Sequence, residues 1–249
     1  MTEPVRIAMW SGPRNISTAM MRSFENRPDA AVVDEPFYAA YLAATGLDHP
    51  MRDEVLASQP LDWREVAAAM AGPAPGGAAV FYQKHMTHHM FGGGGGGGVG
   101  LDWTAACRSA FLIREPAAVL ASYSAKRAEV TLDDIGVVRQ RELFGREADR
   151  LGVAPPVVEG RDVLAGPERV LTALCAALGI PFLPQMLAWP AGSRETDGVW
   201  APAWYDAVQR STGFEPPGDT REIKLSDDLR RIADQARPHY EALAAHAIR

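Results

Sequence analysis

A short loop near the N-terminus combines glycine, arginine and hydroxyl residues in a pattern that suits an anion. The loop follows an apolar run at 5–10 and precedes a helix expected at 17–25. Backbone N–H groups at the start of a helix converge on one point, and the helix dipole adds roughly half a positive charge there. Arginine donates paired hydrogen bonds to phosphate or sulfate oxygens. The residues expected to hold the anion are Ser11, Gly12, Pro13, Arg14, Asn15, Ile16, Ser17 and Thr18.

Two further features limit this interpretation of the loop. Ser17 or Thr18 could cap the helix without any ligand, because a hydroxyl at this position accepts a backbone hydrogen bond. The chain also lacks the pattern G-x-x-x-x-G-K-[ST], which disfavours an ATP or GTP hydrolase of the Walker type.

A second pair of residues could bind another phosphate. Arg114 directly follows an apolar run at 109–113, and Ser122 lies within a helix expected at 116–126. Ser122 would be about two helical turns along, so both side chains could face one cleft. The competing interpretation is a solvated or ion-paired surface arginine, which is common after a strand.

Two positions at the ends of expected strands could accept a proton from a bound hydroxyl group. Glu35 follows the apolar run at 30–34, and His85 follows Lys84 at the end of a run at 79–84. Histidine is the natural base near neutral pH, and a carboxylate is the alternative. The sequence leaves the choice between Glu35 and His85 open.

Both candidates also have purely structural interpretations. Glu35 could form an ion pair with a nearby arginine, and the histidines could be polar residues of a loop. His85 and His89 would suit zinc if this segment were helical, but no carboxylate partner accompanies them. We therefore expect no metal site.

The alternation of short apolar runs with helical segments predicts an α/β fold. Such a pattern is typical of a central parallel sheet with helices on both faces, that is, a three-layer α/β/α arrangement. A chain of 249 residues can bury its core as a single domain spanning 1–249. Strands are expected at 5–10, 30–34, 79–84, 109–113 and 156–158, and helices at 17–25, 39–45, 63–71, 116–126, 131–151, 167–178 and 226–246.

Composition narrows the possible partners and location. A formal net charge of −6 offers no overall attraction to nucleic acid or to an anionic membrane, so any anion must be held locally. No apolar run is long enough to span a bilayer, and a short polar lead precedes the first strand, so we expect a cytoplasmic protein. Cys107 and Cys175 lie in apolar stretches and are expected to be buried, reduced thiols.

Seven consecutive glycines at 92–98 formally match the dinucleotide pattern G-x-G-x-x-G. No strand leads into them and no helix is signalled after them, so the match has no structural support. The run is expected to be a flexible loop. A replaced or unidentified stretch of natural sequence would give the same run.

The segments 11–18 and 111–116, followed by Ser122, resemble the two nucleotide-binding signatures of the sulfotransferase family. Gly198 and Trp200 resemble the family's loop that covers the nucleotide. The resemblance implies a P-loop fold that binds 3′-phosphoadenosine 5′-phosphosulfate. The first segment would hold its 5′-phosphosulfate, and the arginine and serine of the second would hold its 3′-phosphate.

The resemblance also implies an activity, the transfer of a sulfuryl group to a hydroxyl of a small-molecule acceptor, without a metal. Arg14 and Lys84 would stabilise charge on the bridging oxygen. Lys84 and His85 resemble the family's Lys-x-His site shortened by one residue. Glu35 resembles the carboxylate base of some bacterial members. Aromatic-bearing stretches at 37–51 and 200–214 are candidates for the acceptor pocket.

Two alternatives to a sulfotransferase remain at this point. One is a small-molecule kinase on the same P-loop scaffold, which the missing Walker pattern disfavours. The other is a degenerate member that binds a nucleotide or sulfate but transfers nothing. The chain departs from common family residues at Arg14, Ile16 and Ala19, and the departures at Ile16 and Ala19 support the second alternative.

Overall fold

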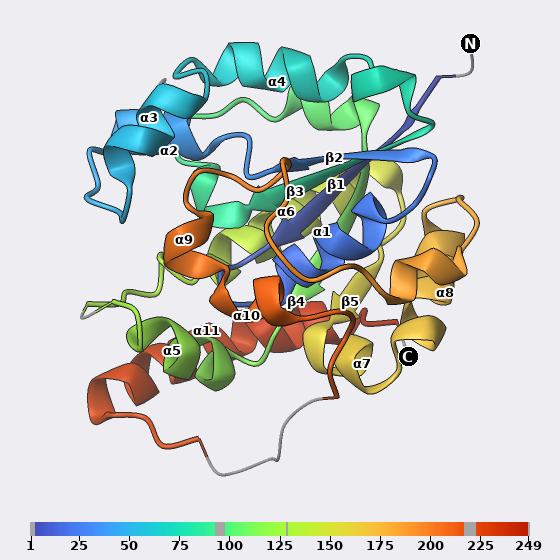
Figure 1. Ribbon diagram of the computed structural model, residues 1–249. Coiled ribbons are helices and arrows are strands. Elements are labelled where there is room, and N and C mark those ends of the chain that lie inside the picture. Colours follow the sequence, from blue (N-terminus) through green and yellow to red (C-terminus); the bar gives the residue numbers. More distant parts are fainter. Residues whose placement is uncertain (1–2, 93–97, 128, 217–222, 249) are drawn as a thin grey trace.

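Five parallel strands form the centre of the structure, a computed structural model that describes residues 3–92, 98–127, 129–216 and 223–248 (Figure 1). Their order in the sheet is β2-β3-β1-β4-β5. The strands β1, β3 and β4 end at the same edge of the sheet, as the pairing of Ser11 with both Met86 and Leu112 shows. The strands are β1 Val5–Ser11, β2 Ala30–Asp34, β3 Val80–Met86, β4 Arg108–Ile113 and β5 Val157–Glu159.

Helices cover both faces of this sheet. They are α1 Ser17–Glu25, α2 Tyr38–Thr45, α3 Arg52–Ser58, α4 Trp63–Ala71, α5 Pro116–Ser124, α6 Val137–Leu151, α7 Gly160–Ala165, α8 Pro167–Ala177, α9 Ala201–Trp204, α10 Asp206–Arg210 and α11 Asp227–Ala244. Short 3₁₀ turns occur at Pro75–Gly77, Thr87–His89, Asp102–Ala106 and Pro184–Leu187.

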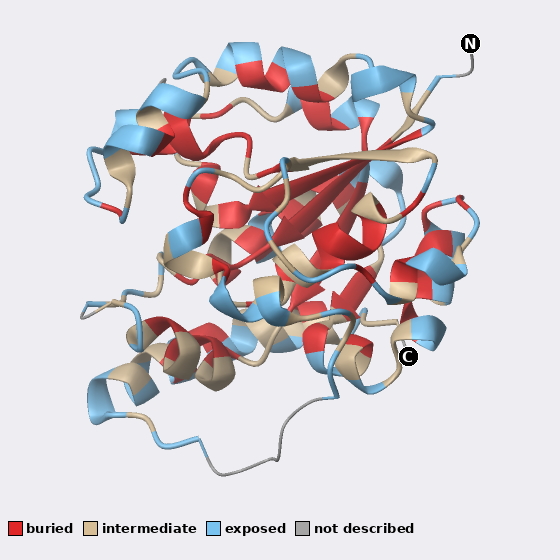
Figure 2. Ribbon diagram, viewed as in Figure 1, coloured by how far each residue is buried: buried red, intermediate tan, exposed pale blue. Residues whose placement is uncertain are grey.

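The core consists of two apolar layers, one on each face of the sheet (Figure 2). On one face, Ile7 and Met9 of β1 pack with side chains of α1, α7 and α8. On the other, Ala8 and Trp10 of β1 pack with α4, α6 and α11. This alternation along β1 follows from the two-residue period of a strand. The three-layer α/β/α fold expected from the sequence is therefore confirmed.

The largest difference from the expected helices lies before α6. A helix was expected from residue 131, but it begins at Val137. Gly136 adopts a left-handed conformation with φ 67°, and Asp134 accepts hydrogen bonds from Thr131 within a separate turn. The short helices α3, α7, α9 and α10 were not expected, since they are too brief to show a helical period.

Several expectations from composition can be compared with the described residues. Cys107 and Cys175 are buried and free, as predicted. Across the described ranges, no group of three or more metal-ligating side chains is positioned to hold an ion. Among those same residues, no helix has the length and apolar character needed to cross a bilayer. Of the glycine run, residues 93–97 lie outside the described part of the chain.

Candidate active site

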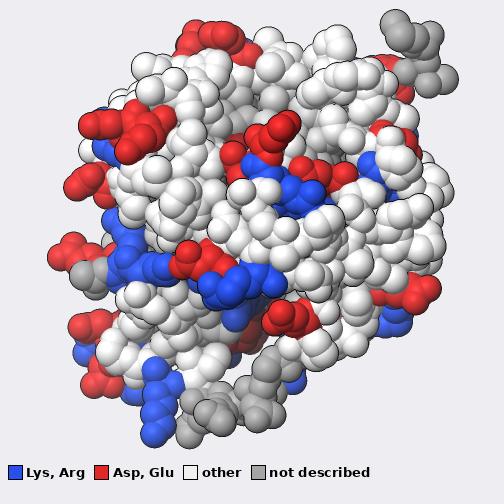
Figure 3. Space-filling model, in the orientation of Figure 1, with Lys and Arg blue, Asp and Glu red and all other residues white. Residues whose placement is uncertain are grey.

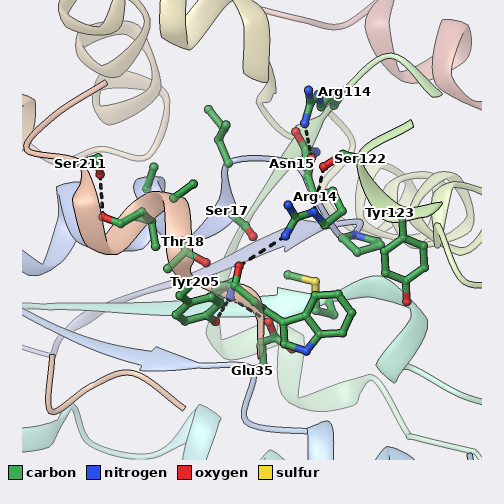
Figure 4. Close-up of a pocket in the computed structure, with 18 of the residues that line it drawn as sticks. Arg14, Asn15, Ser17, Thr18, Glu35, Arg114, Ser122, Tyr123, Tyr205 and Ser211 are labelled. Atoms are coloured by element: carbon green, nitrogen blue, oxygen red, sulfur yellow. Dashed lines mark hydrogen bonds and ion pairs between the residues drawn. The ribbon is translucent and has the colours of Figure 1, made fainter. Parts of the chain in front are cut away.

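A cavity of about 390 Å³ opens at the carboxyl edge of the sheet, between the β1–α1 loop and the ends of β2, β3 and β4. Figure 4 shows Arg14 from that loop and Ser17 and Thr18 from the first turn of α1 around the cavity, with Glu35 on the opposite side. Pro13, Asn15 and Ile16 line the cavity as well. The carboxyl ends of neighbouring parallel strands are the usual location of ligands in open α/β sheets.

The β1–α1 loop is held in an unusual backbone conformation. Arg14 and Ile16 have φ values of 56° and 44°, in the left-handed region that side-chain-bearing residues rarely adopt. The carboxamide of Asn15 donates to the carbonyl of Leu112 at 2.6 Å, which ties the loop to β4. Strained residues of this kind often cluster at ligand sites, where the surrounding contacts enforce them.

Ser11 and Gly12 lie behind the cavity and do not line it. Ser11 is fully buried, and its hydroxyl donates to the carbonyl of Gly12 at 2.7 Å. A Cβ atom at Gly12 would lie 2.5 Å from the backbone oxygen of Ile135, so this position requires glycine. Both residues therefore shape the loop from behind.

The start of α1 has no side-chain cap. Its N-cap residue is Ile16, so neither Ser17 nor Thr18 accepts the capping hydrogen bond considered from the sequence. Ser17 and Thr18 instead line the cavity. The N-terminus of α1 thus presents backbone N–H groups and two hydroxyls to the cavity, an arrangement that suits an anion.

The two sequence signatures meet at this point. Arg14 Nε donates to Ser122 Oγ at 3.0 Å, although the residues are 108 positions apart (Figure 4). Arg114 donates to the backbone oxygen of Arg14 at 2.6 Å and lines the same cavity. The structure therefore brings Arg14, Arg114 and Ser122 together.

The two arginines have no carboxylate partner within 4.0 Å among the described residues. Burial lowers the pKa of Arg114, and the positive charge of Arg14 lowers it further. On the face shown in Figure 3, acidic and basic side chains otherwise lie largely side by side. A bound anion would supply the countercharge that this pair of guanidinium groups lacks.

Lys84 forms the opposite wall of the cavity through a buried polar network. Its ammonium lies 2.8 Å from Asp34 Oδ1, 2.8 Å from Glu35 Oε1 and 2.6 Å from the hydroxyl of Tyr205. An ammonium group has three N–H donors, and all three are engaged here. Burial acts to lower the pKa of Lys84, but the charges of Asp34 and Glu35 hold it well above its ordinary value.

The C-terminal part of the chain completes this network. Tyr205 donates to Asp34 Oδ2 at 2.6 Å and accepts a hydrogen bond from Trp200 Nε1 at 3.0 Å. The backbone N–H of Gly198 donates to the same carboxylate oxygen at 3.1 Å. Gly198 does not line the cavity, whereas Trp200 and Tyr205 do. The sequence marked Tyr205 only as an aromatic residue, because no motif signals a hydroxyl that reaches Asp34.

His85 does not reach the cavity, which corrects one of the two expectations for the base. Its Nε2 lies 3.1 Å from Gln83 Oε1, and its ring stacks on Trp10 at 4.7 Å between centroids. Successive residues of a strand point to opposite faces. Since Lys84 faces the cavity, its neighbour His85 is directed into the core on the other face.

Glu35 stands at the edge of the cavity directly after β2. Its φ of 40° is another left-handed value, and its backbone N–H donates to the carbonyl of Lys84 at 3.0 Å. Burial raises the pKa of its carboxyl group, against the opposing effect of the Lys84 charge. Its second carboxylate oxygen lies 3.9 Å from Nε2 of His89. A carboxylate with a raised pKa in a cavity has the properties of a general base.

Comparison with known proteins finds one family model and two curated relatives. Residues 5–247 match the family model described as "Sulfotransferase domain". The chain is 35% identical over 248 residues to branched-chain-amino-acid aminotransferase-like protein 1 of Arabidopsis thaliana, covering 99% of this chain and 43% of that protein. It is 33% identical to the corresponding protein 2, covering 96% and 41%. The chain thus spans less than half the length of these curated relatives.

Solved structures with the same fold include two sulfotransferase domains. One comes from the Synechococcus PCC 7002 olefin synthase, with a TM-score of 0.54, 17% identity and coverage of 94% of this chain and 95% of that one. The other comes from the curacin biosynthetic pathway, with a TM-score of 0.54, 15% identity and coverage of 95% and 99%. The family model matches almost the whole length of the chain, so the chain belongs to the sulfotransferase domain family.

Proposed function

We propose that this protein transfers a sulfuryl group from 3′-phosphoadenosine 5′-phosphosulfate to a hydroxyl group of a small-molecule acceptor. The observation that carries the proposal is the meeting of Arg14 with Ser122 and Arg114 at the uncapped start of α1. Two half-buried guanidinium groups, with no carboxylate partner among the described residues, are suited to a ligand with two separate anionic groups. The donor has such groups at its 5′ and 3′ positions.

In this proposal the β1–α1 loop holds the 5′-phosphosulfate through its backbone N–H groups and the Arg14 guanidinium. Ser17 and Thr18 add hydroxyl donors from the first turn of α1. Arg114 and Ser122 hold the 3′-phosphate, and Trp200 covers the nucleotide from the C-terminal segment. The positive end of α1 adds to the attraction without any charged side chain.

The proposed reaction needs one proton acceptor and charge stabilisation. The acceptor oxygen forms a bond to sulfur, the bond from sulfur to the 5′-phosphate oxygen breaks, and the hydroxyl proton passes to Glu35. Glu35 is supported as the base because it lines the cavity, whereas His85 faces the core. Arg14 stabilises the charge that develops on the leaving oxygen.

Lys84 would act through its charge and by holding Glu35 in place. All of its N–H donors are engaged by Asp34, Glu35 and Tyr205, so a direct bond from Lys84 to the donor requires one of these to be exchanged. Tyr205 is then a positioning residue, which links the C-terminal segment to the Lys84 and Asp34 side of the cavity.

Calorimetric titration of the purified protein tests the donor site first. The ligands are 3′-phosphoadenosine 5′-phosphate, ATP and AMP, each under the same conditions. Preferential binding of the bisphosphate is the expected result. Binding of ATP alone, or of none of the three, would overturn the assignment of the donor.

Turnover is tested separately with a sulfur-labelled donor and a panel of hydroxyl compounds. Appearance of label in an organic product is expected. Tight binding of the bisphosphate without any labelled product would instead indicate a member that binds the nucleotide and transfers nothing. Magnesium-dependent transfer of phosphate from ATP would indicate a kinase.

A further inference from the structure

The part of the cavity beyond Glu35 has its own composition. It is bordered by four side chains, Tyr38, His49, His88 and His89, which we call the histidine wall. The ring of His89 stacks on Tyr38 with 4.6 Å between centroids, and the hydroxyl of Tyr38 lies 2.9 Å from Nδ1 of His49. His88 packs edge-on against His89 at 4.4 Å. The wall is therefore one contiguous surface that begins beside the proposed base.

The three histidines of the wall are uncharged at neutral pH. Burial is the main cause in each case, and it lowers the pKa of His49 to about 4 and that of His88 to about 3. The pKa of His89 also lies well below its ordinary value, with a further contribution from the neighbouring His88. The wall thus has polar edges but no positive charge to offer to a ligand.

Nearby charges do not replace this missing cation. Lys84 is already paired with Asp34 and Glu35. The charge of Arg127 lowers the pKa of His49, but Arg127 does not line the cavity. It borders a separate surface groove whose other lining residues include the carboxylates Asp48, Asp53 and Glu54.

A charged acceptor would bind poorly in this part of the cavity. An acceptor carboxylate would lose its hydration beside the histidine wall and gain no cation in return. An acceptor ammonium beside the wall would meet Glu35, which already pairs with Lys84 at 2.8 Å, while the other carboxylate that lines the cavity, Glu215, is exposed to solvent. An uncharged compound incurs neither cost, and Met86 and Tyr123 add apolar surface for its body.

We propose that the acceptor is an uncharged, largely apolar alcohol or phenol, selected against anionic and cationic analogues by the histidine wall. This inference rests on the proposed function, since it concerns the acceptor side of the same cavity. It assigns to His49, His88 and His89 a role in specificity, through surface and hydrogen bonding in the uncharged state. None of the three is assigned a part in proton transfer.

Two matched series of compounds test the inference. The phenolic series is para-propylphenol, para-hydroxyphenylpropanoate and tyramine, and the aliphatic series is hexanol, hydroxyhexanoate and aminohexanol. In each series that reacts, kcat/KM for the uncharged member is expected to exceed kcat/KM for both charged members by at least about tenfold, because burying an unpaired charge is costly. Equal or faster sulfation of a charged member would overturn the inference.

Binding provides a readout that does not depend on turnover. Each compound is titrated into the protein saturated with 3′-phosphoadenosine 5′-phosphate. Tighter binding of the uncharged members is expected, and their failure to bind, or tighter binding of a charged member, would overturn the inference. The proposed function fails in a different way, through lack of bisphosphate binding or lack of sulfated product from every compound.

A substitution that adds charge to the wall gives the sharpest comparison. His88 is half-buried and borders the cavity, so His88→Lys places an ammonium beside the acceptor. The preference for uncharged over carboxylated acceptors is expected to fall by about tenfold or more. The control is His246→Lys, at an exposed position packed on Phe144, which should leave the preference unchanged. An unaltered preference in His88→Lys would contradict the inference.

Discussion

The hydroxyl of Tyr205 lies 2.6 Å from the ammonium of Lys84, although 121 residues separate them in the chain. The same hydroxyl donates to Asp34, so it joins the segment after α9 to the ends of β2 and β3. Lys84 in turn contacts Glu35. A single phenol oxygen therefore connects the C-terminal segment to the proposed base.

Tyr205→Phe is expected to lower kcat without lowering the affinity for the donor nucleotide. Removing a hydrogen bond to charged groups costs about 1.5–3 kcal/mol, which corresponds to roughly a tenfold to hundredfold loss of rate. The measurement is kcat together with calorimetric affinity for 3′-phosphoadenosine 5′-phosphate. Tyr240→Phe, on the half-exposed side of α11, is the matched control.

The route of the Tyr205 effect can be tested with a double variant. If Tyr205 acts by positioning Glu35, Tyr205→Phe should have little further effect on kcat in a Glu35→Gln background. Independent, additive losses in the double variant would show that Tyr205 acts by another route.

Arg14→Ala is expected to lower the affinity for the bisphosphate by roughly tenfold to hundredfold, since it removes charge-assisted hydrogen bonds worth about 1.5–3 kcal/mol. Calorimetry measures the change. Arg231→Ala removes an exposed guanidinium that pairs with Asp228 on α11, and the affinity of this variant for the bisphosphate should match that of the parent protein. Undiminished binding in Arg14→Ala would rule out its place in the donor site.

Arg114→Ala is expected to reduce the preference for a 3′-phosphate. The measurement is the ratio of affinities for 3′-phosphoadenosine 5′-phosphate and AMP, which should fall by about tenfold or more. Because Arg114 also donates a hydrogen bond to the backbone of Arg14, some loss of affinity for AMP is expected too. Ser122→Ala keeps that backbone contact. It should lower the ratio of the two affinities with less effect on the affinity for AMP. A ratio unchanged in both variants would contradict the 3′-phosphate assignment.

Glu35→Gln is expected to lower kcat by about a hundredfold to ten-thousandfold, the usual contribution of a general base, while the donor still binds. Only the ionised carboxylate can accept a proton, so the parent enzyme should lose activity as the pH falls through the Glu35 pKa. Burial raises that pKa, so this acidic limb should lie above the ordinary glutamate value of about 4.3. A limb that persists in Glu35→Gln would belong to another group.

The buried histidines predict a loss of stability in acid. His49 takes up a proton near pH 6.5 in the unfolded chain but only near pH 4 in the folded protein. Below pH 6.5 the unfolded state therefore binds more protons, and the free energy of unfolding should fall as the pH decreases towards 4. At pH 5, which is 1.5 units below the unfolded pKa, His49 alone should lower the free energy of unfolding by at most about 2 kcal/mol.

Chemical denaturation across this pH range measures the effect. His49→Gln should show a shallower dependence on pH, whereas His246→Gln, at an exposed position, should follow the parent protein. A parent stability that does not change between pH 6.5 and pH 4 would contradict the burial of neutral His49.

The fold could be predicted from the sequence, and the residue types of the proposed anion site could be recognised in it, because their signals are local. Short apolar runs and the alternation with helices indicate the parallel sheet. The segment 11–18 and the pair Arg114 and Ser122 carry residue types suited to an anion, each next to a strand end. The resemblance to the two nucleotide-binding signatures implied that both segments bind one nucleotide, and Arg14 and Ser122 do meet in the structure.

The proton-accepting side could not be decided in this way. All seven residues of β3 are buried, so its sequence has no polar alternation to show which face each side chain takes. Only the packing of both faces places Lys84 in the cavity and His85 against Trp10.

Long-range contacts decided the rest. Tyr205 reaches Asp34 across 171 residues, and His49 reaches Tyr38 through a loop with no motif. The sequence by itself determined the parallel sheet, its longer helices and the residue types suited to an anion, since these follow from local pattern. Only the tertiary structure decided which side chains surround the proposed base, because burial and side-chain direction depend on how distant segments pack together.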